Sequence, residues 1–369
     1  MTPPPAAVRH GGRRGPADEI RVGLAGYGLA GSVFHAPLIA ATPGLRVASI
    51  ATSNHERAAA ARRDYPGAAI VPDAAALIAR ASELDLIVVA TPNATHATVA
   101  GDALAAGLDV VVDKPFAPTA AEGRALIAQA QAAGRTISVF QNRRWDGDFL
   151  TVQRVLASGE LGNVHRFESR FERWKPQPRA GWKNEADAPG SGVLYDLGTH
   201  LIDQALVLFG AVAAVYAEQR VVRAASAVVD DVFVALTHRN GVVSHLTMSL
   251  ATADAAARFR LFGADGSYTK HGTDVQEDAL REGARPGDRD WGAEPRDAWG
   301  RVAKGSESRV VPTERGAYER YYAALAGALR SGAPLPVDPG DSVAGLEVVE
   351  AANIAAAERC IVTLPVAAR

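Results

Sequence analysis

Short apolar runs rich in β-branched residues alternate with alanine-rich stretches between Glu19 and about Asn142, and this alternation constrains the fold of the 369-residue chain most. A strand–helix–strand rhythm returns each strand to one sheet as a parallel neighbour, with the helices covering its faces. We therefore expect an α/β fold that begins with a doubly wound parallel sheet. The predicted strands are 20–25, 46–51, 86–90, 110–112 and 136–140, and the predicted helices are 30–41, 56–65, 96–106 and 120–133.

The rhythm changes after Trp145. A helix, a polar loop over 171–192 and a long helix over 192–209 precede consecutive strand-like runs without crossover helices, which predicts an α+β part with a large, mainly antiparallel sheet. We also expect a long loop over 271–309 and helices at 317–330 and 345–360. The predicted units are a disordered tail (1–18), a Rossmann NAD(P)-binding domain (19–142) and a C-terminal domain for substrate binding and oligomerisation (143–369).

Composition excludes several classes of protein. The net charge is −2 with no long basic run, so we expect no nucleic-acid partner. The longest apolar run free of charges, residues 205–217, is too short for a membrane span of about 20 residues. A single cysteine, Cys360, rules out an intrachain disulfide and favours a reducing compartment, the cytoplasm. The paired Arg13 and Arg14 lack the apolar segment of an export signal.

A strict G-x-G-x-x-G motif follows the first predicted strand. By chance a chain with this glycine content holds about 0.3 such motifs, so the strand before it and the helix after it give the motif its weight. The glycines allow a tight turn and a close approach of backbone to a pyrophosphate, which the helix N-terminus would bind. The alternative is a glycine-rich surface turn. The predicted dinucleotide-binding residues are Gly26, Tyr27, Gly28, Leu29, Ala30 and Gly31.

The end of the second strand bears on the choice between NAD and NADP. An NAD enzyme places a carboxylate there for the ribose 2′-hydroxyl, whereas this chain has Ser53 and Asn54, with Arg57 a turn further on. Hydrogen-bond donors and a guanidinium suit a 2′-phosphate, so NADP is favoured. Glu56 is the counter-argument, because a shifted loop would let it bind the ribose of NAD.

The loop after the strand 86–90 is predicted to line the cofactor groove through Thr91, Pro92, Asn93 and His96. The alternative is a capped helix start with His96 on the surface. The next strand runs into Asp113-Lys114-Pro115, which places Lys114 at the carboxyl end of a parallel strand, where ligands of open α/β sheets bind.

A second cluster of titratable groups lies on the long helix. At 100° per residue Asp196, His200 and Asp203 share one stripe of an otherwise apolar helix. Three explanations are open: satisfied polar groups packed between domains, a metal site, or acid–base chemistry. Counted together with Lys114 and the glycine motif, acid–base chemistry on a hydroxyl that loses hydride is the interpretation we favour, with no metal.

Together these motifs make the sequence resemble the Gfo/Idh/MocA family of sugar and cyclitol oxidoreductases. The resemblance runs from about Arg21 to Val366 and rests on the glycine motif, Asp113-Lys114-Pro115 and the pair Asp196/His200. Stretches around 28–37, 141–146 and 195–204 are similar to the subgroup that contains NADP-dependent scyllo-inositol dehydrogenase. The family usually has Glu where this chain has Asp113.

The resemblance implies roles for individual residues. Lys114 would orient the reacting hydroxyl and stabilise charge on its oxygen, and His200 would be the general base. Asp196 would bind a neighbouring hydroxyl or tune the pair, and the sequence leaves open which of Lys114 and His200 takes the proton. A cis peptide bond after Lys114 is common in the family. Further predicted cofactor contacts are Asp113 and Asn142, and possible substrate contacts in the preceding loop are Arg173, Trp174 and Trp182.

The predicted activity is therefore interconversion of a secondary alcohol and a ketone on a cyclitol or sugar, by a homodimer or homotetramer. Two alternatives remain open: cleavage of glycosides through transient oxidation with retained NAD, and a non-catalytic nucleotide sensor. Retention of Lys114, Asp196 and His200 argues against the sensor.

Overall fold

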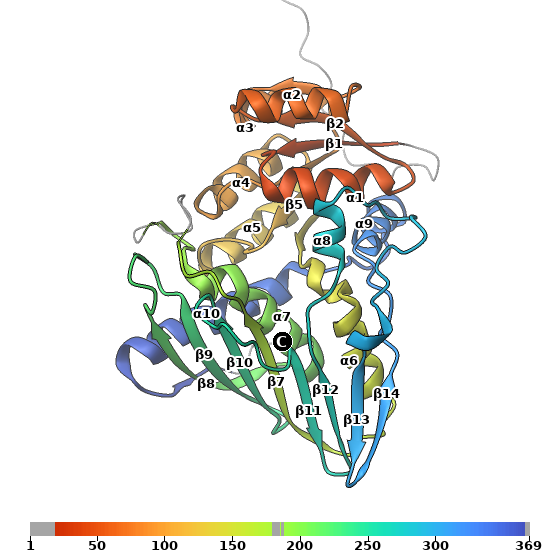
Figure 1. Ribbon diagram of the computed structural model, residues 1–369. Coiled ribbons are helices and arrows are strands. Elements are labelled where there is room, and N and C mark those ends of the chain that lie inside the picture. The colour runs from red at the N-terminus through yellow and green to blue at the C-terminus, as the bar shows by residue number, and fades with distance from the viewer. Residues whose placement is uncertain (1–18, 179–184, 186–187, 366–369) are drawn as a thin grey trace, which may run out of the picture.

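A computed structural model describes residues 19–178, 185 and 188–365, and in this part the chain forms two sheets (Figure 1). The first is a six-stranded parallel sheet with the order β3-β2-β1-β4-β5-β6, the doubly wound arrangement that the sequence predicts. Its strands are β1 (Ile20–Ala25), β2 (Leu45–Ala51), β3 (Ala69–Val71), β4 (Leu86–Val89), β5 (Asp109–Asp113) and β6 (Ile137–Phe140).

Helices wrap this sheet as crossovers. The predicted helix over 30–41 begins with a π-helical segment and continues as an α-helix, and the other three lie within a residue of their predicted bounds. The sequence analysis missed β3 and α3, because three residues at a sheet edge and a five-residue helix show no clear period. The elements are η1 (Ala30–His35), α1 (Ala36–Ala41), α2 (His55–Asp64), α3 (Ala74–Ile78), α4 (His96–Ala105) and α5 (Ala120–Ala133).

The second sheet has nine strands in the order β14-β13-β12-β11-β7-β10-β9-β8-β15 and is antiparallel except where β7 and β10 pair in parallel. A mainly antiparallel second sheet was predicted. Its strands are β7 (Val164–Glu172), β8 (Val212–Arg220), β9 (Asp231–His238), β10 (Val243–Ser249), β11 (Phe259–Gly263), β12 (Ser267–Lys270), β13 (Gly300–Lys304), β14 (Glu307–Val311) and β15 (Val362–Thr363).

The long loop predicted over 271–309 is wrong in part. It contains α8 (Gln276–Arg281) and most of the hairpin formed by β13 and β14, which pairs at the edge of the second sheet. The polar loop predicted to begin at 171 also overlaps the end of β7. The hairpin places β14 at the edge of the sheet with its first four residues exposed, and edge strands of this kind lack the apolar alternation by which strands are recognised.

Three helices cover one face of the second sheet: α6 (Gly147–Ala157), α7 (Thr199–Phe209) and α10 (Pro339–Glu358), seen behind the strands in Figure 1. Buried side chains from these helices and from inward-facing strand positions such as Phe167 and Leu246 form one core. Helix α10 starts six residues before its predicted position, capped by Asp338. Residues 199–205 of α7 are all buried, so its polar side chains as well as its apolar ones lie against other parts of the protein.

The C-terminal helices join the two cores. Helix α9 (Glu319–Ser331) and the preceding Tyr318 pack into the core of the first sheet, where Tyr321 and Tyr322 are fully buried. Helix α10 contributes Leu346 to that core and Val349 to the other. The predicted domain boundary between residues 142 and 143 therefore stays a prediction, because helices after it contribute to both cores. The predicted tail, 1–18, lies outside the described residues. Within the described residues, no helix has the length and apolar character needed to span a bilayer.

Candidate active site

The glycine motif forms an open cradle at the carboxyl end of β1. Gly26 has φ of +102°, and a Cβ on Gly31 would collide with the carbonyl oxygen of Gly26, so both positions require glycine. A Cβ on Gly28 would meet only Nη1 of Arg57, at 3.7 Å. The space beside Gly28 and the helix that starts just after it fit a dinucleotide pyrophosphate, which needs close backbone approach and N–H donors.

Side chains of the motif point elsewhere. Tyr27 is 4% exposed and packs edge-to-face against Tyr65, and burial raises its pKa to about 12. Leu29 is half exposed, and Ala30 begins η1. This segment therefore offers a ligand its main chain rather than functional side chains.

At the end of β2, Asn54 caps α2 by accepting a hydrogen bond from the Arg57 N–H at 2.9 Å. The cap fixes the first turn of α2, and Ser53, Arg57 and Glu56 are all exposed along it. Because Arg57 lies beside Gly28, its guanidinium borders the space that the glycine cradle leaves open.

The loop after β4 contacts the second half of the chain. Nδ2 of Asn93 donates to the carbonyl of Gly190 at 3.0 Å, while Thr91 and Pro92 form the turn before it. His96 is 1% exposed, and both of its ring nitrogens lie against main-chain carbonyls, so it supports the turns after β4 and β5 from within. The surface alternative for His96 is excluded.

Lys114, which directly follows β5, contacts the helical segment that leads into α7, so the two halves of the chain meet at this residue. Nζ of Lys114 donates to the main-chain carbonyl of Asp196 at 2.6 Å and lies 3.4 Å from its Oδ1. The Lys114–Pro115 peptide bond is cis, as the resemblance implied. Oδ1 of Asp113 accepts from the Lys114 N–H. Burial alone would raise the pKa of Asp113, but His35, Lys114 and His96 together hold it below its usual value.

A π-helical turn, η6 (Leu194–Gly198), carries Asp196 and leads into α7. The Thr199 N–H bonds to the carbonyl of Leu194, five residues earlier, so the 100° spacing of the sequence analysis fails across this turn. Such turns widen the helix and are frequent at functional sites. His200, 5% exposed, follows on α7.

Asp203 anchors this helix rather than joining the site. It accepts from Nε and Nη2 of Arg144 at 2.9 and 2.7 Å, and Gln204 donates to the carbonyl of Arg143 at 2.9 Å. Burial raises the pKa of Asp203, and Arg144 opposes that shift. Both arginines lie in η4 (Asn142–Trp145), the turn that follows β6. The turn therefore fixes where α7 holds His200.

The predicted substrate contacts differ in placement. The Arg173 guanidinium stacks over Phe171 at 4.7 Å and lies 3.9 Å from Glu277, and its side chain is 32% exposed. Trp174 is 58% exposed just beyond the end of β7, where it forms an isolated β-bridge with Ala251, and Trp182 lies outside the described residues. Asn142 is 6% exposed at the start of η4.

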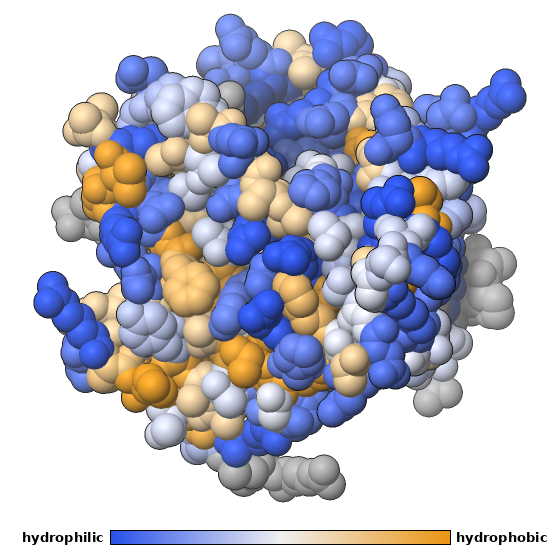
Figure 2. Space-filling view, turned by 60° about the horizontal axis from the view of Figure 1, so that its bottom comes forward, coloured by the Kyte–Doolittle hydropathy of each residue, from blue (hydrophilic) through white to orange (hydrophobic). Residues whose placement is uncertain are grey.

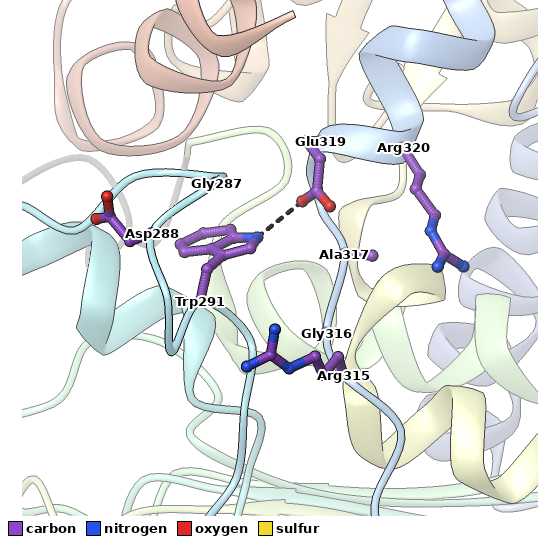
Figure 3. A pocket seen from close by; sticks show the side chains of 8 residues that line it. All are labelled: Gly287, Asp288, Trp291, Arg315, Gly316, Ala317, Glu319 and Arg320. Atoms are coloured by element: carbon purple, nitrogen blue, oxygen red, sulfur yellow. Dashed lines mark hydrogen bonds between the residues drawn. The ribbon is translucent and has the colours of Figure 1, made fainter.

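Two further observations bound the site. Among residues 19–178, 185 and 188–365, no three His, Cys, Asp or Glu side chains are grouped to hold a metal ion. A separate pocket of about 250 Å³ lies beside Trp291, whose indole donates to Glu319 (Figure 3). Its lining includes neither a residue of the glycine motif nor Lys114, Asp196 or His200.

Comparison with known proteins agrees with this geometry. Residues 20–141 match the family described as "Oxidoreductase family, NAD-binding Rossmann fold", and residues 149–269 match the "GFO/IDH/MocA C-terminal domain". This chain belongs to the Gfo/Idh/MocA family. It is an oxidoreductase with an NAD-binding Rossmann fold, and its relatives in that family include dehydrogenases of inositol and sugars.

Several family members are similar over nearly their whole length. The uncharacterized oxidoreductase YdgJ of Escherichia coli is 42% identical, covering 90% of this chain and 95% of its own. IolW of Bacillus subtilis, a scyllo-inositol 2-dehydrogenase (NADP(+)), is 35% identical over 96% and 98%. The solved structure of the putative oxidoreductase yvaA of B. subtilis superposes with a TM-score of 0.90 at 34% identity, covering 95% and 100%.

The sequence analysis did not single out the residues that hold this site together. Arg144 pairs with Asp203 and Glu277 pairs with Arg143, each across more than 50 positions of the sequence, and all four side chains are at most 15% exposed. A sequence signal did exist for the first: Arg143 and Arg144 follow a buried strand directly, where two arginines need buried partners.

Proposed function

We propose that the chain is an NADP-preferring dehydrogenase that interconverts a secondary hydroxyl and a ketone on a cyclitol or sugar. The observation that carries the proposal is the contact between Lys114 and Asp196, which joins the lysine of the cofactor half to the helix of His200. The bound nicotinamide would supply hydride exchange at its ring carbon, and the protein supplies position and proton transfer.

Each residue has a distinct task in this proposal. The Lys114 ammonium lies at the carboxyl end of β5, where it would hold the reacting oxygen and stabilise the negative charge that develops on it. His200 would accept the hydroxyl proton, because imidazole titrates near neutrality. The Asp196 carboxylate lies beside Lys114 and would orient a neighbouring hydroxyl. Arg173 would bind a hydroxyl further along the ring.

The NADP preference is supported by the end of β2. Ser53 and Arg57 are exposed beside the glycine cradle, and the Arg57 guanidinium lies near Gly28. A 2′-phosphate would gain charge-assisted hydrogen bonds there. The name of the relative IolW, a scyllo-inositol 2-dehydrogenase (NADP(+)), supports the same choice.

We also propose that two or four copies assemble through the second sheet. Among the described elements, helices pack on only one of its faces, while Tyr216, Phe233 and Phe262 lie on the other. Figure 2 shows hydrophobic side chains gathered between hydrophilic ones on the end of the molecule that carries this sheet. Light scattering after size exclusion tests this, and a monomer at micromolar concentration would contradict it.

The test of the reaction is nicotinamide absorbance with the purified chain. NADP and NAD are offered separately with a panel of inositols and aldoses, and the reduced cofactors with the corresponding ketones. Turnover with a cyclitol or sugar, faster with NADP, is the expected result. Cofactor binding without net turnover on the whole panel would contradict the proposal and favour glycoside cleavage or sensing.

A further inference from the structure

His96 has an unusual pair of partners. At the start of α4, its Nδ1 lies 2.7 Å from the carbonyl oxygen of Pro115 and its Nε2 lies 2.9 Å from that of Thr91. The ring is 1% exposed, so water does not replace either partner. The two carbonyls belong to the turns that follow β5 and β4, which are neighbours in the first sheet.

Chemistry limits how both contacts can be made. A carbonyl oxygen only accepts hydrogen bonds, and a neutral imidazole has one N–H and one lone pair. A neutral ring would therefore bond one carbonyl and turn its lone pair toward the other. The imidazolium, with an N–H on each nitrogen, satisfies both.

We propose that His96 is a positioning residue which, as an imidazolium, clamps the carbonyls of Thr91 and Pro115 and thereby fixes Lys114 against the wall of the cofactor groove. Pro115 follows Lys114 directly, and Thr91 begins the loop that reaches Gly190 through Asn93. The clamp thus joins the turn of the reacting lysine to the loop that spans both halves of the site. The inference rests on the function proposed above.

Charges around the ring act in both directions. The pKa of His96 is lowered overall, because burial, with a smaller contribution from the Lys114 ammonium, outweighs the Asp113 carboxylate and the two carbonyls, so the imidazolium is expected on the acid side of neutrality. Asp113 remains charged, and Nε2 of His35 lies 3.8 Å from its Oδ1. The clamp is complete while the ring keeps its proton, and one carbonyl bond is lost when the proton leaves.

A second buried histidine provides a matched control. His238 is also 1% exposed, with Nδ1 2.9 Å from the carbonyl of Gly210 and Nε2 2.8 Å from Oγ of Ser244. A serine hydroxyl can donate or accept, so a neutral His238 satisfies both contacts. It lies in the second sheet, at the end of β9, and touches none of the proposed reacting groups.

The experiment compares His96→Leu, His96→Gln, His238→Leu and the wild type with the substrate that the wild type turns over. We expect His96→Leu to lower kcat about 10-fold to 100-fold, since a displacement of about 1 Å at a reacting group costs up to 10²-fold. Its NADP dissociation constant should change less than about threefold. His96→Gln, which keeps a donor, should recover part of kcat. His238→Leu should lower thermal stability by a similar amount but leave kcat within about twofold.

The charge of the ring is read independently by ¹⁵N spectra of histidine-labelled protein between pH 5 and 8, with His96 assigned by its loss in His96→Leu. Two protonated nitrogens at the acid end are expected. A neutral ring over the whole range, or equal effects of the His96 and His238 variants on kcat, overturns the clamp. An inactive wild type whose His96 still shows two protonated nitrogens would instead overturn the proposed function.

Discussion

The two halves of the site are held in place by different forces. Around Lys114 the partners are mostly main-chain groups: the carbonyls that contact His96 and the N–H that bonds to Asp113. Under α7 they are buried charged side chains, as in Arg144 with Asp203 and Arg143 with Glu277. The first arrangement would keep the proposed reacting group, Lys114, in register with the cofactor. The second makes the placement of His200 depend on charges that titrate and are costly to leave unpaired.

The largest expected loss of activity comes from removing the proposed reacting group of either half. Lys114→Ala and His200→Ala should each lower kcat by about 10² to 10⁴, with cofactor affinity nearly unchanged, because both act in the transition state. Steady-state kinetics and cofactor fluorescence measure the two quantities. Lys304→Ala, at the exposed last residue of β13, is the control and should behave as wild type. Full activity in either site variant would remove that residue from the site.

Breaking an anchor of the second half should cost stability. Asp203→Asn leaves Arg144 buried with only the half-exposed Asp341 as an ionic partner, and we expect a loss of about 3 kcal/mol in urea unfolding. Burial raises the pKa of Asp203, which means that the folded protein disfavours the charge of this carboxylate. Much of the expected loss therefore comes from leaving the Arg144 guanidinium without its partner. Glu347→Gln, which breaks an exposed pair with Arg124, should change stability by less than about 1 kcal/mol.

The double variant Arg144→Met with Asp203→Leu sharpens this interpretation. If the cost of Asp203→Asn comes from an uncompensated charge, replacing both partners by apolar side chains should restore most of the stability. A double variant as unstable as the single one would show instead that the geometry of the pair matters.

Unfolding measured against pH should separate two carboxyl groups of the second half whose pKa values are shifted in opposite directions. Burial would raise the pKa of Glu277, but Arg143, Arg281 and Arg173 lower it to about 2. A depressed carboxyl pKa stabilises the fold above the unfolded value of about 4.5 and loses that contribution as the pH falls toward 2, about 3 kcal/mol in all. Urea unfolding at pH 2.5 to 6 should therefore show a steep acid limb that Glu277→Gln flattens.

Asp274 acts in the opposite direction and serves as the control. Burial, with the Asp148 charge, raises its pKa to about 6. A raised carboxyl pKa favours folding below the unfolded value of about 3.8, and that contribution is lost as the pH rises through 6. Asp274→Asn should change the slope between pH 4 and 6 and leave the acid limb intact. An acid limb that survives in Glu277→Gln would contradict the assignment.

The same contrast explains how much the sequence could predict. The first sheet, the glycine motif and Lys114 were predicted because strand period, helix caps and a local motif are encoded within a few residues. The pairing of Arg144 with Asp203, or of Arg143 with Glu277, depends on separations of 59 and 134 residues, which no local pattern encodes. The π-helical turn at Asp196 was missed for a related reason, since the contact that it makes is to a lysine 82 residues away.

The smallest expected effect concerns the exposed end of β2, where cofactor choice is proposed to lie. Arg57→Ala should weaken NADP binding about tenfold and leave NAD binding within about twofold, since one charge-assisted hydrogen bond to an exposed phosphate is lost. Ser53→Asp should shift preference further toward NAD, because a carboxylate repels the 2′-phosphate and accepts from a ribose hydroxyl. Arg62→Ala, in the last turn of the same helix, is the matched control.

Both dissociation constants come from fluorescence titration, with kcat/KM ratios as a second readout. Because Arg57 is exposed and its main chain is fixed by the Asn54 cap, its side chain can be removed without moving α2. An unchanged NADP to NAD ratio in Arg57→Ala and Ser53→Asp would thus place recognition of the 2′-position elsewhere. If Glu56→Gln alone lowered NAD affinity, that carboxylate would be the ribose ligand, and the preference would be for NAD.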